Sequence, residues 1–119
     1  MVLASVSYGQ NNSQLGFICV FKTNPNLLEV VAKVNMRQNS AEVFNWDTET
    51  FDRRELRQTI NYISLWNPSS NTNFYIDRTS LDGGRDRNSD THGCSVNTWS
   101  EVDAFIQRKI SRLNETRAF

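Results

Sequence analysis

The sequence predicts a single α+β domain over residues 1–119, built as an antiparallel β-meander of four to five strands packed by two helices. Three observations support this prediction. Apolar and polar residues alternate with the period of a strand up to Trp46, and turn residues separate the alternating segments. Two later segments repeat apolar residues at helical spacing behind capping residues. Finally, 119 residues of 38% hydrophobic content suffice for one core and leave little room for a second.

The meander is expected to contain four sequential strands. The segment 15–22 is apolar on both faces, which is typical of a central strand covered on both sides. The segment 26–37 fits two structures, because Asn26 and Glu29 have capping-box spacing while the residues from Leu28 onwards alternate. A strand is favoured there, since β-branched residues and a period of two agree. The expected strands are 2–8, 15–22, 28–36 and 41–46, with a short strand at 73–78 beyond them.

A first helix is predicted over 53–66. Asp52 and Glu55 have the spacing of a capping box, and apolar residues follow at helical intervals. Proline disfavours helix in the residue before it, so this helix is expected to stop before Pro68. The apolar residues that define the helix are Leu56, Ile60 and Ile63.

A second, C-terminal helix is predicted over 98–114. Thr98 with Glu101, or Ser100 with Asp103, supplies its capping box. One apolar stripe runs along this segment and charged residues gather opposite, so the stripe is expected to pack on the sheet. The stripe consists of Val102, Phe105, Ile106, Ile110 and Leu113.

Charge and cysteine content narrow the function classes. Thirteen basic residues balance thirteen acidic ones, which argues against a dedicated duplex-DNA binder and favours self-association into a homo-oligomer. The N-terminal residues lack the basic start and apolar run of a secretion signal, and no segment is apolar enough to span a membrane. Cys19 and Cys94 are too few for a disulfide framework, so reduced cysteines and a cytoplasmic location are expected.

The segment Asp77–Cys94 concentrates the residues that can carry chemistry. It reads DRTSLDGGRDRNSDTHGC and holds four aspartates, three arginines and the only histidine of the chain. It is predicted to form one long loop between a short strand and the C-terminal helix. Loops of that length in a small domain usually serve a function.

Catalytic and metal-binding interpretations of this loop are weak. Asp90, His92 and Cys94 offer the three groups of a small hydrolase, but no helix N-terminus is placed to activate the thiol. Asp86, Asn88 and Asp90 copy the start of a calcium-binding EF-hand loop, whose later positions lack the required glycine and glutamate. No catalytic residue, metal or cofactor is therefore expected, and binding is favoured over enzymatic activity.

An anion site fits the loop better. Gly83–Gly84 can expose backbone N–H groups, and the loop arginines offer forked donors for phosphate. The competing interpretation is that each arginine pairs with a neighbouring aspartate, which would leave the loop self-neutralised. Arg53, Arg54 and Arg57 oppose the dipole at the start of the predicted helix, and a partner surface would explain their placement. The predicted binding residues are Arg78, Arg85, Arg87, His92, Arg53 and Arg57.

The sequence favours a small, non-catalytic intracellular binding or regulatory protein. It would use the 77–94 loop to contact a protein partner, a second copy of itself or an anionic ligand, as an inhibitor from a phage or mobile element would. The first alternative is a nucleotide or single-stranded nucleic-acid binder that holds phosphates with Arg53, Arg57, Arg85 and Arg87. The second alternative is the small hydrolase. No membrane partner is expected.

Overall fold

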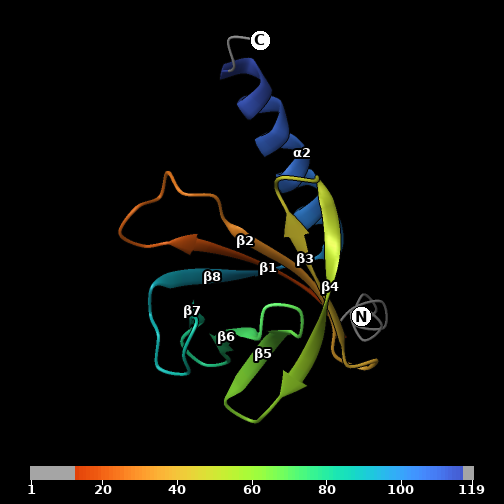
Figure 1. Ribbon diagram of the computed structural model, residues 1–119, viewed down its shortest axis with the longest axis vertical. Helices are drawn as coiled ribbons and strands as arrows, with labels where there is room; N and C mark the ends of the chain where they lie inside the picture. Colours follow the sequence, from red (N-terminus) through yellow and green to blue (C-terminus); the bar gives the residue numbers. More distant parts are fainter. Residues whose placement is uncertain (1–12, 117–119) are drawn as a thin grey trace, which may run out of the picture.

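The computed structural model describes residues 13–116, which form a closed antiparallel β-barrel of eight strands with one helix packed on its outside (Figure 1). Each strand pairs with the next in sequence, and the last strand returns to pair with the first. The predicted open sheet of four to five strands packed by two helices is therefore wrong. The elements are β1 Gln14–Phe21, β2 Val30–Asn35, β3 Ser40–Asn45, β4 Thr50–Gln58, β5 Tyr62–Asn67, β6 Thr72–Asp77, β7 Asp82–Gly84, β8 His92–Asn97 and α2 Trp99–Thr116.

The barrel interior is filled by side chains at alternate strand positions. Because successive side chains of a strand point to opposite faces, every second residue enters the barrel. In an eight-stranded barrel the interior is just wide enough for side chains to fill it. The buried residues of this core are Phe17, Cys19, Ala32, Val34, Ala41, Leu56, Ile63, Leu65 and Ile76.

The segment predicted as a helix over 53–66 is instead the hairpin of β4 and β5. Leu56 is buried in the barrel, but Ile60, which a helical stripe would bury beside it, is 88% exposed at the hairpin turn. Thr59 Oγ1 accepts a hydrogen bond from the backbone N–H of Tyr62 (2.9 Å), which closes the turn. The helical prediction failed because a strand, a turn and a second strand happened to space their apolar residues at helical intervals.

Several other predicted elements are confirmed. The strands expected at 15–22, 28–36, 41–46 and 73–78 correspond to β1, β2, β3 and β6. The expected strand at 2–8 lies outside the described residues. The segment 77–94 is not one loop, because it contains β7 and the start of β8. No helix within residues 13–116 is long and apolar enough to cross a membrane.

Helix α2 packs on the outer face of β1 and β2, as its apolar stripe predicts, and it extends beyond the barrel (Figure 1). Its capping box is formed: Glu101 accepts a hydrogen bond from the Thr98 N–H (2.7 Å), and Thr98 Oγ1 accepts one from the Glu101 N–H (3.1 Å). Val102 and Ile106 are buried against the barrel. Val102 sits over Gly16 of β1, where a side chain would leave no room for it.

Four hairpin turns within residues 13–116 share one design. Each turn follows an Asn or Asp whose side-chain oxygen accepts backbone N–H groups of the turn. The last residue of each turn has a positive φ, between 54° and 64°. These turns contain five of the fourteen asparagines in the chain. The leading residues are Asn35, Asn45, Asn67 and Asp77, and the positive-φ residues are Asn39, Glu49, Asn71 and Leu81.

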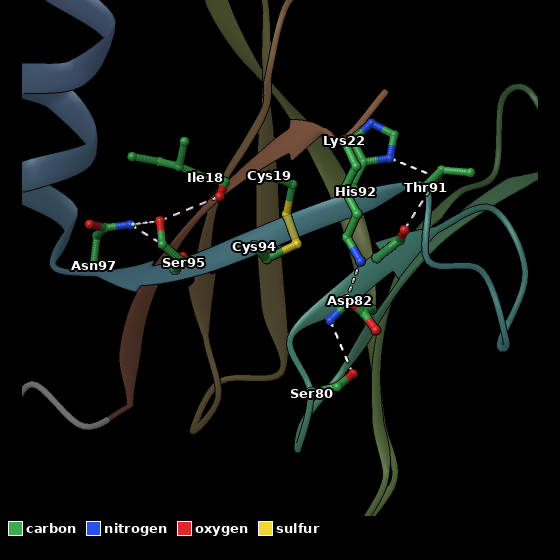
Figure 2. The surroundings of a disulfide bond; sticks show 11 residues. Ile18, Cys19, Lys22, Ser80, Asp82, Thr91, His92, Cys94, Ser95 and Asn97 are labelled. Atoms are coloured by element: carbon green, nitrogen blue, oxygen red, sulfur yellow. Dashed lines mark hydrogen bonds and ion pairs between the residues drawn. A yellow bond between two sulfur atoms is a disulfide. The ribbon is translucent and has the colours of Figure 1, made fainter. Parts of the chain in front are cut away.

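A disulfide between Cys19 and Cys94 joins β1 to β8 where the barrel closes (Figure 2). The two residues are direct partners in the register of these strands, with their Cα atoms 4.0 Å apart. Cys94 donates its N–H to Leu81 on the other side (2.8 Å), so the cysteines form one of the close pairs that exchange no backbone hydrogen bonds. The expectation of reduced cysteines is therefore wrong, because it took no account of which strands pair.

Candidate binding site at the barrel mouth

One end of the barrel carries its two longest connections and opens into a cavity. The strands alternate in direction, so the β1–β2 connection (22–29) and the β7–β8 connection (85–91) lie at the same end, to the left in Figure 1. The cavity at this end, which we call the mouth, has a volume of about 390 Å³. Every strand except β7 lines the mouth, and its wall includes Phe21, Val43, Arg54, Leu65, Phe74 and His92.

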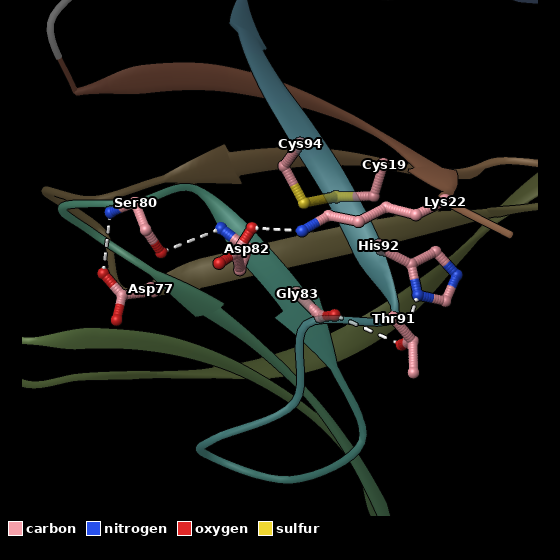
Figure 3. A network of polar contacts seen from close by, with 9 residues as sticks. All are labelled: Cys19, Lys22, Asp77, Ser80, Asp82, Gly83, Thr91, His92 and Cys94. Atoms are coloured by element: carbon pink, nitrogen blue, oxygen red, sulfur yellow. Dashed lines mark hydrogen bonds and ion pairs between the residues drawn. A yellow bond between two sulfur atoms is a disulfide. The ribbon is translucent and has the colours of Figure 1, made fainter.

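Three rings form one wall of the mouth. The imidazole of His92 meets the Phe21 ring edge to face at 4.9 Å and the Phe74 ring at 5.1 Å. Thr91 Oγ1 is hydrogen-bonded to His92 Nδ1 (2.9 Å) and donates to the Gly83 carbonyl (3.3 Å), which fixes the imidazole ring (Figure 3). Together the three rings give this wall of the mouth an aromatic and apolar surface.

The charged residues of the mouth are all basic. Arg54 points inward from β4 and Arg85 directly follows β7, and no carboxylate of residues 13–116 lines the cavity. Arg54 donates to the Arg53 carbonyl (2.9 Å), while Arg85 makes no ion pair or hydrogen bond with any described residue. Strand β4 lies four strands from β8 in either direction, so Arg54 and His92 face each other across the barrel. Basic side chains therefore gather at the mouth in a chain of zero net charge.

Two leucines on the β1–β2 connection extend the apolar wall of the mouth. Leu27 is 47% exposed and Leu28 44% exposed, although both are large hydrophobic residues. Exposed apolar side chains beside a cavity are typical of a ligand or partner site, because they gain burial when the site fills.

A polar groove adjoins the mouth on the outer face of β6. This outer groove has a volume of about 380 Å³ and shares Thr72, Asn73 and Arg85 with the mouth. Its lining residues are Asn71, Thr72, Asn73, Tyr75, Arg85, Asp86 and Arg87.

Close packing behind the groove requires the two consecutive glycines. A Cβ on Gly84 would lie 2.2 Å from the Ser89 Cβ, and one on Gly83 would lie 3.0 Å from the Cys94 Sγ. Neither glycine has a positive φ. Gly84 therefore lets the following loop come close to β7, and Gly83 leaves room for the Cys94 sulfur and the Phe74 ring. Exposure of their backbone N–H groups to an anion stays a prediction from the sequence.

Three of the predicted binding residues lie together. His92 lines the mouth, Arg87 lines the outer groove, and Arg85 lines both. These arginines do not pair with the loop aspartates: Asp77 caps a turn and Asp82 pairs with Lys22 (2.7 Å; Figure 3).

The other predicted binding residues lie elsewhere. Arg78 donates to the Thr59 carbonyl (2.8 Å) at the opposite end of the barrel. Arg53 and Arg57 are exposed on the outer face of β4, and the Arg57 guanidinium lies 5.1 Å from the Trp66 ring centre. Arg53 and Arg57 were predicted as binding residues because they were assigned to the start of a helix, where their charge suggested a partner surface.

The most informative mouth residue, Arg54, was noted in the sequence beside Arg53 and Arg57, but it was not among the predicted binding residues. Arg54 alternates with buried Leu56 on the inner face of β4, and an arginine on an inner face is the signal that a strand assignment would have revealed. The hydrolase alternative loses its nucleophile, because Cys94 is bonded to Cys19 and has no thiol.

The fold and the site together define a small β-barrel with a basic, ring-lined mouth at one end. A scan of protein-family models and searches of curated proteins and of solved structures find no match to this chain.

Acidification should destabilise the protein through His92. Burial lowers the pKa of this imidazole below its usual value of 6.5, so the unfolded chain binds the proton more readily than the fold does. Stability should therefore fall as the pH drops from above 6.5 towards the lower pKa of the folded state. Urea unfolding between about pH 8 and 5 measures this slope. The His92→Phe variant should show a smaller slope, and an equal slope in both proteins would contradict the assignment.

Proposed function

We propose that this protein is a non-catalytic binding protein whose barrel mouth takes a small ligand with an apolar or aromatic body and an anionic group. One observation carries the proposal: the mouth combines rings and leucines with Arg54, Arg85 and His92, and its described lining residues include no acid. Its volume of about 390 Å³ falls within the range of small-molecule sites, which often occupy barrel mouths.

The chemistry of the mouth favours an anion over a neutral ligand. Arg54 is half-buried and lacks a carboxylate partner within residues 13–116. A ligand anion would supply charge-assisted hydrogen bonds to the guanidinium in a partly desolvated place, where they are stronger than in water. The apolar body would cover Leu27 and Leu28.

The regulatory role expected from the sequence stays part of the proposal. Arg85, Arg87 and His92, from the segment 77–94, keep the binding role that the sequence gave them, and Arg54 joins them. Inhibition of a protein partner, homo-oligomer formation and an origin in a phage or mobile element remain predictions from the sequence. The alternative that joined Arg53 and Arg57 to Arg85 and Arg87 loses support, since the first two line neither the mouth nor the outer groove.

The cytoplasmic location also remains a prediction from the sequence. Disulfides persist mainly in oxidising compartments, so the Cys19–Cys94 bond favours a different location. Alkylation of the protein at the moment of cell lysis, followed by mass measurement, would decide between them: alkylated cysteines support the cytoplasm, and unmodified cysteines contradict it.

Replacing Arg54 should weaken the binding of an aromatic anion. Naphthalene-2-sulfonate and neutral 2-naphthol serve as matched probes in isothermal titration calorimetry. The Arg54→Met variant should bind the sulfonate about tenfold more weakly and 2-naphthol about as well, because it loses a charged partner and keeps the apolar stem.

The neighbouring residue provides the control for this experiment. Arg53 carries the same charge one position away on the outer face of β4, so Arg53→Met should leave the affinity for both probes unchanged. Equal effects of the two substitutions would indicate a general charge effect and contradict a site in the mouth.

A further inference from the structure

The mouth and the outer groove form one continuous surface across the rim of the barrel. Both cavities are lined by Thr72, Asn73 and Arg85, where β6 begins and β7 has just ended. The two volumes, about 390 and 380 Å³, are similar. A ligand anchored in the mouth can therefore continue over the rim at Arg85 into the groove.

The groove offers donors for more than one negative group. Arg85 and Arg87 are two residues apart, both are exposed, and neither makes an ion pair or hydrogen bond with a described residue. The hydroxyl of Tyr75 and the amide of Asn71 add neutral donors, and Asp86 is the one acid among the lining residues. Guanidinium groups in such a row suit successive phosphate groups, each of which accepts forked hydrogen bonds.

The loop that carries these arginines is held in place by its own hydrogen bonds. The Ser89 N–H donates to the Asp86 carbonyl (3.0 Å), and Ser89 Oγ accepts from the Asp86 N–H (3.1 Å). The loop thus turns back on itself between Arg85 and Thr91. The Thr91 hydroxyl donates a hydrogen bond to the Gly83 carbonyl. A preordered loop loses less entropy when it binds a ligand.

The mouth, in contrast, suits a flat ring with a polar edge. The rings of Phe21, Phe74 and His92 supply apolar and aromatic contact. The amides of Asn67 and Asn73 line the same cavity and offer their NH2 groups as donors, while their oxygens accept from the Ser69 N–H and the Ser64 hydroxyl. Heteroaromatic rings combine a stacking face with such an edge.

We propose that the ligand is a free nucleoside diphosphate, with its base in the mouth and its phosphates passing Arg85 to reach Arg87 in the outer groove. This inference rests on the proposed function of the mouth and specifies its ligand. It places the phosphates on Arg85 and Arg87 and the base in the mouth beside Arg54, so it differs from the four-arginine site that the sequence suggested. The base places a ring among the aromatic residues, and the two phosphates match the two unpaired arginines.

Calorimetric titration with nucleotides tests the two-part ligand. The diphosphates of adenosine, guanosine, cytidine and uridine are compared first, and the tightest is then compared with its monophosphate, its nucleoside and pyrophosphate. Affinity should decrease from diphosphate to monophosphate to nucleoside, and pyrophosphate alone should bind at least about tenfold more weakly than the diphosphate because it leaves the mouth empty.

The variant Arg87→Ala separates the groove from the mouth. It should lower the affinity for the diphosphate about tenfold and affect the monophosphate less, because the second phosphate loses its partner. Arg37→Ala removes the same charge from an exposed turn at the opposite end of the barrel and should change neither affinity.

The outcomes distinguish this inference from the proposed function. If naphthalene-2-sulfonate binds through Arg54 and no nucleotide binds, the mouth is a ligand site and the nucleotide is wrong. Equal binding of pyrophosphate and the diphosphate would leave only an anion groove and overturn the inference. Tighter binding of a single-stranded oligonucleotide than of any diphosphate would replace the free nucleotide with a nucleic acid. If no probe binds, both proposals fail.

Discussion

Reduction of the Cys19–Cys94 disulfide should lower the free energy of unfolding by about 4 kcal/mol. The bond links residues 75 positions apart, and a covalent loop of that size removes much conformational freedom from the unfolded chain. It also fastens β8 to β1 beside β7, which has only three residues. Since small domains are stable by about 5–15 kcal/mol, the reduced barrel should lie close to unfolding.

Urea unfolding with and without dithiothreitol measures this effect. The wild-type midpoint should fall sharply in the reductant. The double variant Cys19→Ala/Cys94→Ala should unfold near the reduced wild type and should not respond to dithiothreitol. A wild-type midpoint that stays the same after complete reduction, verified by thiol titration, would show that the strand pairing alone closes the barrel.

The Gly16→Ala substitution should destabilise the protein by about 2–3 kcal/mol. The new Cβ would lie 2.4 Å from the Val102 Cγ2 and 3.0 Å from the Thr98 carbonyl oxygen. Val102 is fully buried and Thr98 begins the helix, so neither neighbour can move without shifting α2 off β1. Thermal unfolding followed by circular dichroism measures the loss.

Gly93 offers a matched control for this substitution. It lies on β8, next to β1, and a Cβ there would meet only the Lys22 Cε at 3.6 Å, an ordinary contact with a flexible side chain. The Gly93→Ala variant should change stability by less than about 0.5 kcal/mol. If both variants are equally stable, α2 does not pack against β1 as closely as described.

The sequence correctly predicted β1 and α2, because the residue pattern of each fits only one kind of secondary structure. β1 is apolar on both faces because one face lines the barrel and the other lies under α2, and this was recognised. The capping box at Thr98 and the stripe behind it identified α2. The hairpin of β4 and β5 was missed, because its apolar residues fit the helical period until the exposure of Ile60 is known.

The hairpin turns carried a signal that could have prevented this error. Asn35 and Asn45 are ten residues apart, as are Asn67 and Asp77, and each begins a turn of the same design. Equal spacing of turn-forming residues is typical of a β-meander with strands of equal length. It indicated strands on both sides of the segment 53–66.

Only part of the candidate site was predictable from the sequence, because closure of the barrel brings together residues that are far apart in the chain. Arg85, Arg87 and His92 were found because they cluster in sequence. The contribution of Arg54 depends on the closure of the barrel, which brings β4 opposite β8. The pairing of Cys19 with Cys94 depends on the same closure. Local patterns report strands and turns, but they do not report which distant strands meet.

The pairing of β1 with β8 also sets an order of folding. All other strand pairs join neighbours in the sequence and can form as hairpins, whereas this pair brings together residues 75 positions apart and carries most of the loop-closure entropy. We therefore expect the sheet to assemble progressively from its hairpins and to close last. The cysteines meet only when that step is complete, so formation of the disulfide reports that a chain has finished folding.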